Sequence, residues 1–168
     1  MPTRLSSNEE DVRRAEADIR RRMGRRKLDF PALLVVANIY RAATTVRNRI
    51  EREVLAEVGL TWGGFTILFV LWVWGPMEAA SLADECGLAQ GTLTGMVRTL
   101  ARRGLVESRR LDTDRRRVRI GLTSSGEQMI EDVLPRCNAV ESSMVDGLSS
   151  QEVTQLSRLL RTVIRDAG

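Results

Sequence analysis

Residues 111–123 read LDTDRRRVRIGLT and place four arginines in a short loop and the segment that follows it. Val118, Ile120 and Leu122 alternate there with arginine or glycine, and this period of two is typical of a strand with one apolar and one cationic side. Residues 105–110 have the composition of a partner strand. The two strands predict a hairpin with guanidinium groups at its tip, a shape that can reach along a DNA duplex and enter a groove.

Two short helices are expected ahead of the hairpin, near residues 80–86 and over residues 90–103, with a turn at Gly87-Leu88. The second helix has a buried side defined by helical spacing: Leu93, Met96, Val97, Leu100 and Ala101. Its other side offers donors and acceptors for bases and phosphates: Gln90, Thr92, Thr94 and Arg98. An ordinary solvated helix face is the alternative. Two helices, a tight turn and a hairpin together predict a winged helix-turn-helix.

Capping residues indicate where several other helices begin and end. Gly59 should end a long helix that begins near Asp29, and Thr61 should cap the apolar helix that follows. Thr123 has the position of a cap for a later helix, and Ser149 and Glu152 have the spacing of a capping box.

The rest of the chain is expected to be helical, so the predicted fold class is mainly α with a small β-hairpin wing. Residues 1–28 predict a basic helical extension broken at Gly24, with a disordered basic arm as the alternative. Residues 29–60 and 124–168 form the expected helical dimerisation region, and residues 61–123 the DNA-binding domain. The two helices of residues 29–74 carry more apolar surface than one small lobe can cover, which favours a homodimer.

The positive charge is concentrated in two blocks. Residues 1–28 carry nine basic and five acidic side chains, and residues 90–123 carry nine and three, whereas the remaining segments are net acidic. Twenty-five of the 26 basic residues are arginine, whose planar fork suits phosphates and guanine edges. Segregated positive charge on an acidic body indicates a polyanionic partner, here double-stranded DNA.

The wing combines two carboxylates with its arginines. We expect Asp114 to hold the guanidinium of Arg116 by paired hydrogen bonds and to preset it for the minor groove. The other wing arginines would face phosphates: Arg109, Arg110, Arg115, Arg117 and Arg119. A solvated basic loop is the alternative. A carboxylate pair for acid–base catalysis is disfavoured, because dense arginines would lower both pKa values and leave no proton to give.

Composition excludes several other functions. The chain has no histidine, which removes histidine-based nucleophilic triads and histidine-ligated zinc, and no cofactor, metal site or enzymatic activity is expected. Cys86 and Cys137 are expected to be buried small hydrophobes, with a redox sensor at Cys86 as the alternative. The apolar run of residues 65–74 is too short to cross a bilayer, and residues 1–28 are too acidic for a transit peptide, so a cytoplasmic protein is expected.

Several short motifs occur in a set order: Leu60-Thr61, Gly75-Pro76, Leu82-Ala83, Gly87-Leu88, RGLV at residues 103–106, and Asp114-x-Arg116-x-x-x-Ile120-x-Leu122-Thr123. In this order they resemble the MarR family of bacterial transcriptional regulators over roughly residues 30–165. The resemblance implies a homodimer joined by its N- and C-terminal helices, with two winged lobes on a pseudo-palindromic operator. It also implies repression that is relieved by a small phenolic or other aromatic ligand, or by oxidation. Gly95 and Arg98 depart from the family pattern, which often has an arginine and an acidic residue there.

A ligand pocket is expected where the dimerisation helices meet the winged lobe. Its candidates are four aromatic residues and one cation that suits an acidic ligand: Tyr40, Arg47, Trp62, Phe65 and Trp72. Core and interface packing is the alternative role for these side chains. The sequence therefore predicts a DNA-binding repressor released by a small aromatic or acidic ligand. The alternatives are a constitutive DNA-binding protein and a thiol-responsive regulator acting through Cys86.

Overall fold

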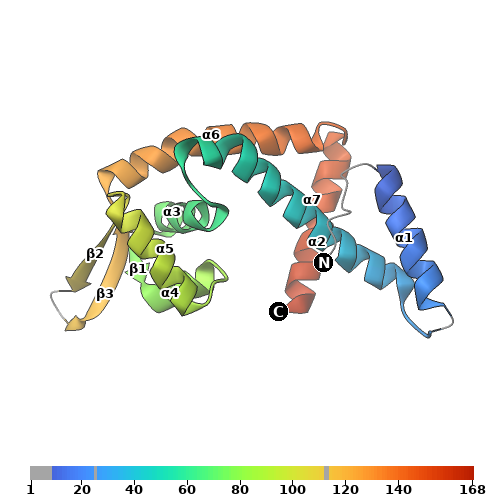
Figure 1. The fold of residues 1–168 in the computed structure, drawn as a ribbon, viewed down its shortest axis with the longest axis horizontal. Coiled ribbons are helices and arrows are strands. Elements are labelled where there is room, and N and C mark those ends of the chain that lie inside the picture. The colour runs from blue at the N-terminus through green and yellow to red at the C-terminus, as the bar shows by residue number, and fades with distance from the viewer. Residues whose placement is uncertain (1–8, 25, 112–113) are drawn as a thin grey trace. The chain divides into compact units, whose positions relative to one another are not determined.

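The computed structural model (Figure 1) describes residues 9–24, 26–111 and 114–168, with side chains described outside residues 109–117. The chain divides into two compact units, residues 1–49 and 50–168, which are treated separately below. The predicted division into a dimerisation region and a DNA-binding domain depends on contacts with a partner chain and with DNA, so it stays a prediction.

The first unit contains the N-terminal extension and most of the long helix that follows. Helix α1 spans Glu9–Met23 and ends at Gly24, whose φ of 56° is left-handed, so both the predicted helix and its break are confirmed. Helix α2 spans Phe30–Ile50 and begins where the Asp29 carboxylate accepts a hydrogen bond from the Ala32 backbone N–H. The extension packs against α2, because the Arg20 guanidinium lies 5.3 Å from the centre of the Phe30 ring.

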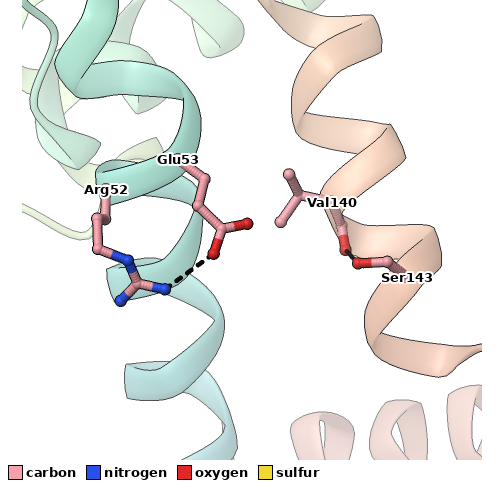
Figure 2. Close-up of polar contacts among 4 residues, drawn as sticks. All are labelled: Arg52, Glu53, Val140 and Ser143. Atoms are coloured by element: carbon pink, nitrogen blue, oxygen red, sulfur yellow. Dashed lines mark hydrogen bonds and ion pairs between the residues drawn. The ribbon is translucent and has the colours of Figure 1, made fainter.

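The long helix does not keep α-helical geometry to its end. A π-helical turn, η1 (Glu51–Leu55), follows α2, then a 3₁₀ turn, η2 (Ala56–Val58), and the left-handed Gly59 ends the run. The predicted end at Gly59 is confirmed, whereas the π turn was not predicted. Figure 2 shows η1 facing helix α6 (Ser124–Val145), with Glu53 accepting from Arg52 at 2.8 Å and pointing towards α6.

Helix α3, Trp62–Trp74, forms the centre of the second unit. Thr61 caps it as predicted by accepting from the Gly64 N–H, and the Glu51 carboxylate accepts from the Trp62 N–H at 3.1 Å. Ile67 and Leu68 are fully buried on α3. They share the core with side chains from η1, the helix-turn-helix and α6: Val54, Leu55, Leu82, Leu93, Leu100, Ile130, Val133 and Cys137.

Helices α4 (Ala79–Glu85) and α5 (Gln90–Arg102) follow and precede the hairpin strands β2 (Val106–Leu111) and β3 (Asp114–Leu122). This is the predicted winged helix-turn-helix. Strand β1 (Met77–Glu78) was not predicted; it pairs with β3 and makes a three-stranded antiparallel sheet in the order β1-β3-β2. The sheet ties the base of the wing to the segment that leaves α3.

The C-terminal helices are α6 and α7 (Ser150–Ala167), which begin at the predicted caps Thr123 and Ser149. Ser149 and Glu152 form the predicted capping box, and Pro135 lies inside α6. Every residue of α7 except Thr162 is exposed, including a stripe of apolar side chains: Val153, Leu156, Leu159, Leu160, Val163 and Ile164.

Among the described residues no single helix is long and apolar enough to cross a membrane; only the bent pair of residues 30–58 and Trp62–Trp74 reaches that threshold together.

Candidate nucleic-acid interface

The local sequence between α4 and α5 produces a tight turn. Gly87 adopts a φ of 62°, and the Leu88 N–H reaches back to the Ala83 carbonyl at 2.8 Å, the pairing that ends a helix on a left-handed glycine. Leu82 and Ala83 are buried, so α4 is fixed against the core and supports the start of α5 at Gln90. The turn therefore positions α5 with one side free of the lobe.

Helix α5 buries Leu93 and Leu100 and leaves its opposite side exposed. The four predicted DNA-contacting residues on this helix are all exposed: Gln90, Thr92, Thr94 and Arg98. On the predicted buried side, Met96 and Val97 are half-buried, but Ala101 is exposed, so that part of the prediction was wrong. Ala101 lies in the last turn of α5, directly after the buried Leu100, on a side that no neighbouring element of the described residues covers.

The threonine hydroxyls on α5 are oriented by the helix backbone. Thr94 donates to the Gln90 carbonyl at 2.8 Å, and Thr99 donates to the Gly95 carbonyl at 3.1 Å. Because each hydroxyl proton is used inside the helix, the oxygen can still accept a hydrogen bond from outside and the methyl group can make an apolar contact. Such groups can accept from a base amino group or touch a thymine methyl group.

Small residues make the exposed side of α5 hollow. A Cβ at Gly91 or Gly95 would have nothing within 4 Å, and a hollow of about 390 Å³ runs along this part of the helix. Its lining comes from α5 and the residue before α3: Thr61, Gly91, Thr92, Gly95, Met96 and Thr99. A ligand surface can therefore approach the helix backbone closely, which base edges in a major groove require.

The wing is formed by β2 and β3. Val106 pairs with Leu122 at its base and Leu111 pairs with Asp114 near its tip, with an irregularity between Arg110 and Leu111. Ile120 is buried, but Val118 is 40% exposed because β3 extends beyond the lobe at that point. The side chains of six predicted DNA-contacting residues lie outside the described residues: Arg109, Arg110, Asp114, Arg115, Arg116 and Arg117. The expected Asp114–Arg116 pairing therefore stays a prediction, whereas Arg119 is exposed next to them.

The predicted ligand residues fall into both units. Tyr40 is 72% exposed and Arg47 is also exposed on α2, in the first unit. In the second unit Trp62 and Phe65 are brought together, with ring centres 5.8 Å apart, while Trp72 is 41% exposed on α3. Phe69, which was not among the predicted ligand residues, extends this pair, with its ring centre 6.1 Å from that of Phe65. A period of four along α3 was the available signal.

The cysteines do not have the properties of reactive thiols. Burial, and secondarily the neighbouring Glu85 carboxylate, raises the pKa of the Cys86 thiol, so less thiolate is present at neutral pH. Cys137 is buried in the core as predicted, and burial raises its pKa as well. Cys86 is only half-buried, so the prediction of a buried side chain was wrong there. Among the described residues no group of three or more potential ligand side chains is placed to hold a metal ion.

One long-range contact that the sequence did not indicate is made by Arg103, which follows α5. Its guanidinium donates to the backbone carbonyls of Val58 and Gly59 at 2.8 and 2.6 Å. A basic residue directly before the helix-ending Gly104 was the only signal, because such residues often interact with the last carbonyls of a helix. The partner carbonyls lie 44 and 45 residues away, which no local pattern indicates.

Comparison with known proteins identifies this arrangement. The sequence model of the MarR family matches residues 60–118, which include α3, α4, α5 and most of the wing. The HTH-type transcriptional regulator YwaE of Bacillus subtilis (strain 168) is 35% identical over 137 residues, covering 81% of this chain and 80% of YwaE.

Solved structures show the same fold. A MarR family protein from Bacillus stearothermophilus superposes with a TM-score of 0.70 at 26% identity, over 83% of this chain and 98% of that protein. BpsR of Bordetella bronchiseptica, described in a study of how 6-hydroxynicotinic acid regulates its DNA binding, superposes with a TM-score of 0.69 at 24% identity, over 77% of this chain and 91% of BpsR.

Proposed function

Because this chain belongs to the MarR family of transcriptional regulators, we propose that it is a homodimeric repressor whose binding to a pseudo-palindromic operator is released by a small aromatic acid. The observation that carries the proposal is the exposed polar side of α5 on a lobe that also carries an arginine-rich wing. A regulator of this kind is not expected to catalyse a reaction. It would act in the cytoplasm, where a bacterial chromosome lies.

The proposed DNA contacts divide between helix and wing. Helix α5 would enter the major groove, where Gln90 suits adenine and the methyl groups of Thr92 and Thr94 suit thymine. Arg98 would bind phosphate or guanine from the next turn. The hairpin tip would lie in the flanking minor groove, with Arg116 inserted and the neighbouring arginines on phosphates.

The exposed apolar stripe of α7 supports the homodimer. Ile164 is 70% exposed and Leu156 and Leu159 are each 45% exposed, on a helix with no buried residue. A contiguous apolar stripe of this kind is the mark of a surface that another chain covers. A second copy of the same chain would cover the stripe symmetrically. The two α5 helices of the dimer would then lie about one helical turn of DNA apart.

Two features support a small acidic aromatic effector. BpsR has the same fold, and its DNA binding is regulated by 6-hydroxynicotinic acid. In this chain the half-buried ring of Trp62, packed beside the buried Phe65, offers an aromatic surface within the second unit. The raised pKa of Cys86 disfavours the thiol-responsive alternative, since a sensor thiol needs a large thiolate fraction.

Selection from a random duplex pool followed by a shift assay tests the proposal. The full-length protein should enrich an inverted repeat, and the selected duplex should be released when aromatic acids such as 6-hydroxynicotinic acid are titrated. Release by none of a panel of such acids would favour a constitutive DNA-binding protein. Enrichment of no sequence would contradict specific DNA binding.

A further inference from the structure

The side chain of Arg103 links the C-terminal end of α5 to the end of η2 by hydrogen bonds. The two terminal nitrogens of Arg103 donate to two successive carbonyl oxygens, that of Gly59 at 2.6 Å and that of Val58 at 2.8 Å. A Cβ at Gly59 would lie 3.8 Å from the same guanidinium, so the side chain rests directly on this residue. Arg103 therefore joins two segments that are far apart in the sequence.

The carbonyls that Arg103 contacts are at a place where a cation is favourable. They end η2, and the last carbonyls of a helical run lack partners within it and carry the negative end of its dipole. Gly59 adopts a φ of 64°, and the Leu60 N–H bonds to the Leu55 carbonyl at 2.9 Å, which closes the run. A planar guanidinium can satisfy two exposed carbonyls at once, whereas an ammonium acts as a single point.

The two residues after Arg103, Gly104 and Leu105, are hydrogen-bonded to Thr123. The Thr123 hydroxyl donates to the Gly104 carbonyl at 2.5 Å, and the Thr123 N–H donates to the Leu105 carbonyl at 3.2 Å. The same hydroxyl accepts from the Gly126 N–H at 3.1 Å and so caps α6. The end of α5 is thus held between the end of η2 and the start of α6. We call residues 58–59, 103–105 and 123 the α5 junction.

We propose that Arg103 is a positioning residue for DNA recognition: it fixes the direction of α5 relative to η2 and α6 and does not itself contact DNA. This inference rests on the proposed function, in which two copies of α5 must enter successive major grooves at a set spacing. Base contacts need this geometry, whereas non-specific attraction to phosphates does not. Loss of the Arg103 bonds should therefore weaken discrimination between operator and random DNA.

Arg103→Ala and Arg102→Ala form a matched pair for the test. Both residues are exposed, and each substitution removes one positive charge from the same end of α5. The bond described for Arg102 stays within the helix, at 3.4 Å to Thr99, whereas Arg103 reaches Val58 and Gly59. The ratio of affinities for a duplex selected from a random pool and for an unrelated duplex of equal length is measured at fixed salt. Arg103→Ala should lower this ratio about tenfold, while Arg102→Ala leaves it unchanged. Arg103→Lys, which can reach one carbonyl, should give an intermediate ratio.

Amide hydrogen exchange of the DNA-free protein gives a readout that does not need an operator. In Arg103→Ala the amides of Leu60, Gly104 and Leu105 should exchange faster, while those of the α3 core keep their protection. Arg102→Ala should leave all of them unchanged. A general loss of protection in Arg103→Ala would show that the residue only stabilises the fold, and that result would overturn the proposal.

Two further outcomes are decisive. If Arg103→Ala matched Arg102→Ala in both the affinity ratio and the exchange, Arg103 would not position α5. If Arg103→Ala lowered the slope of log affinity against log salt by about 1 more than Arg102→Ala does, Arg103 would be a direct phosphate contact instead. Failure of the wild-type protein to select any duplex would contradict the proposed function, and the exchange measurements would still show whether Arg103 holds the junction.

Discussion

Gly126 lies so close to the carbonyl oxygen of Leu105 that a β-carbon at residue 126 would be 2.0 Å from it. This contact places the first turn of α6 directly on the segment that joins α5 to β2. Gly126→Ala should therefore lower the free energy of unfolding by about 3 kcal/mol, because the new methyl group can be accommodated only if the backbone at Leu105 shifts. Urea unfolding measures the change, with Gly147→Ala, which would have nothing within 4 Å of its new methyl group, as the control. Equal effects of the two substitutions would contradict this packing.

Gln90→Ala removes a polar side chain at the start of α5, the proposed recognition helix. If Gln90 contacts an adenine, the variant should lose about 1–3 kcal/mol of discrimination at one base pair in each half-site. Selection with the variant should show that one position relaxed and the others unchanged. Gln128→Ala, at an exposed position on α6, should leave the selected sequence as in the wild type. An unaltered selected sequence for Gln90→Ala would show that this side chain reads no base.

Arg116→Ala tests the minor-groove role of the wing. Operator affinity should fall by about 2 kcal/mol, and the slope of log affinity against log salt should become shallower by about 1, because one cationic contact is lost. Fluorescence anisotropy over a range of salt concentrations measures both. Arg158→Ala, on the exposed surface of α7, removes the same charge and should change neither. Wild-type affinity in Arg116→Ala would mean that the wing tip does not contact DNA.

Leu156→Glu tests the proposed subunit interface on the apolar stripe of α7. If a second copy covers this stripe, the substitution should raise the dimer dissociation constant by about a hundredfold or more, since each chain would place a charge in an apolar interface and lose the contact of one leucine. Gln151→Glu adds the same charge at the start of α7, away from the stripe, and should leave the constant unchanged. Sedimentation velocity over a concentration series separates the two. A wild-type constant for Leu156→Glu would place the subunit interface elsewhere.

The thiol of Cys86 should react slowly. Since burial and Glu85 raise its pKa, the thiolate fraction at neutral pH is smaller than that of free cysteine, and alkylation should accelerate only at higher pH. The rate is measured against pH in a Cys137→Ser background, where Glu85→Gln should speed the reaction. Peroxide should leave operator affinity unchanged. Fast alkylation at neutral pH together with peroxide-sensitive binding would restore the thiol-responsive alternative.

The helix boundaries were largely predictable because they depend on local chemistry. Thr61 and Ser149 cap helices as the sequence indicated, and Gly59 ends a helix in the left-handed conformation. Strand β1 was not predictable, because its two residues have no periodicity and are a strand only through pairing with Ile120 and Arg119 of β3. The π turn likewise has no sequence signature of its own.

The candidate interface was predictable where exposure follows from helical spacing, as at Gln90 and Arg98. The same rule failed at Ala101, because spacing shows which residues share a side of a helix but not which of them the neighbouring elements cover. Arg103 could not be assigned, since its partners are backbone carbonyls 44 and 45 residues away. A resemblance in sequence identifies the family, but it does not show which groups fix the orientation of α5.

Methylation interference on the selected duplex tests most directly whether helix and wing bind DNA together. We expect two half-sites about one helical turn apart. Major-groove modification should block binding at the centre of each half-site, and minor-groove modification should block it on the outer flank. Interference in a single half-site, or in the major groove alone, would contradict a dimer that holds DNA with both α5 and the wing.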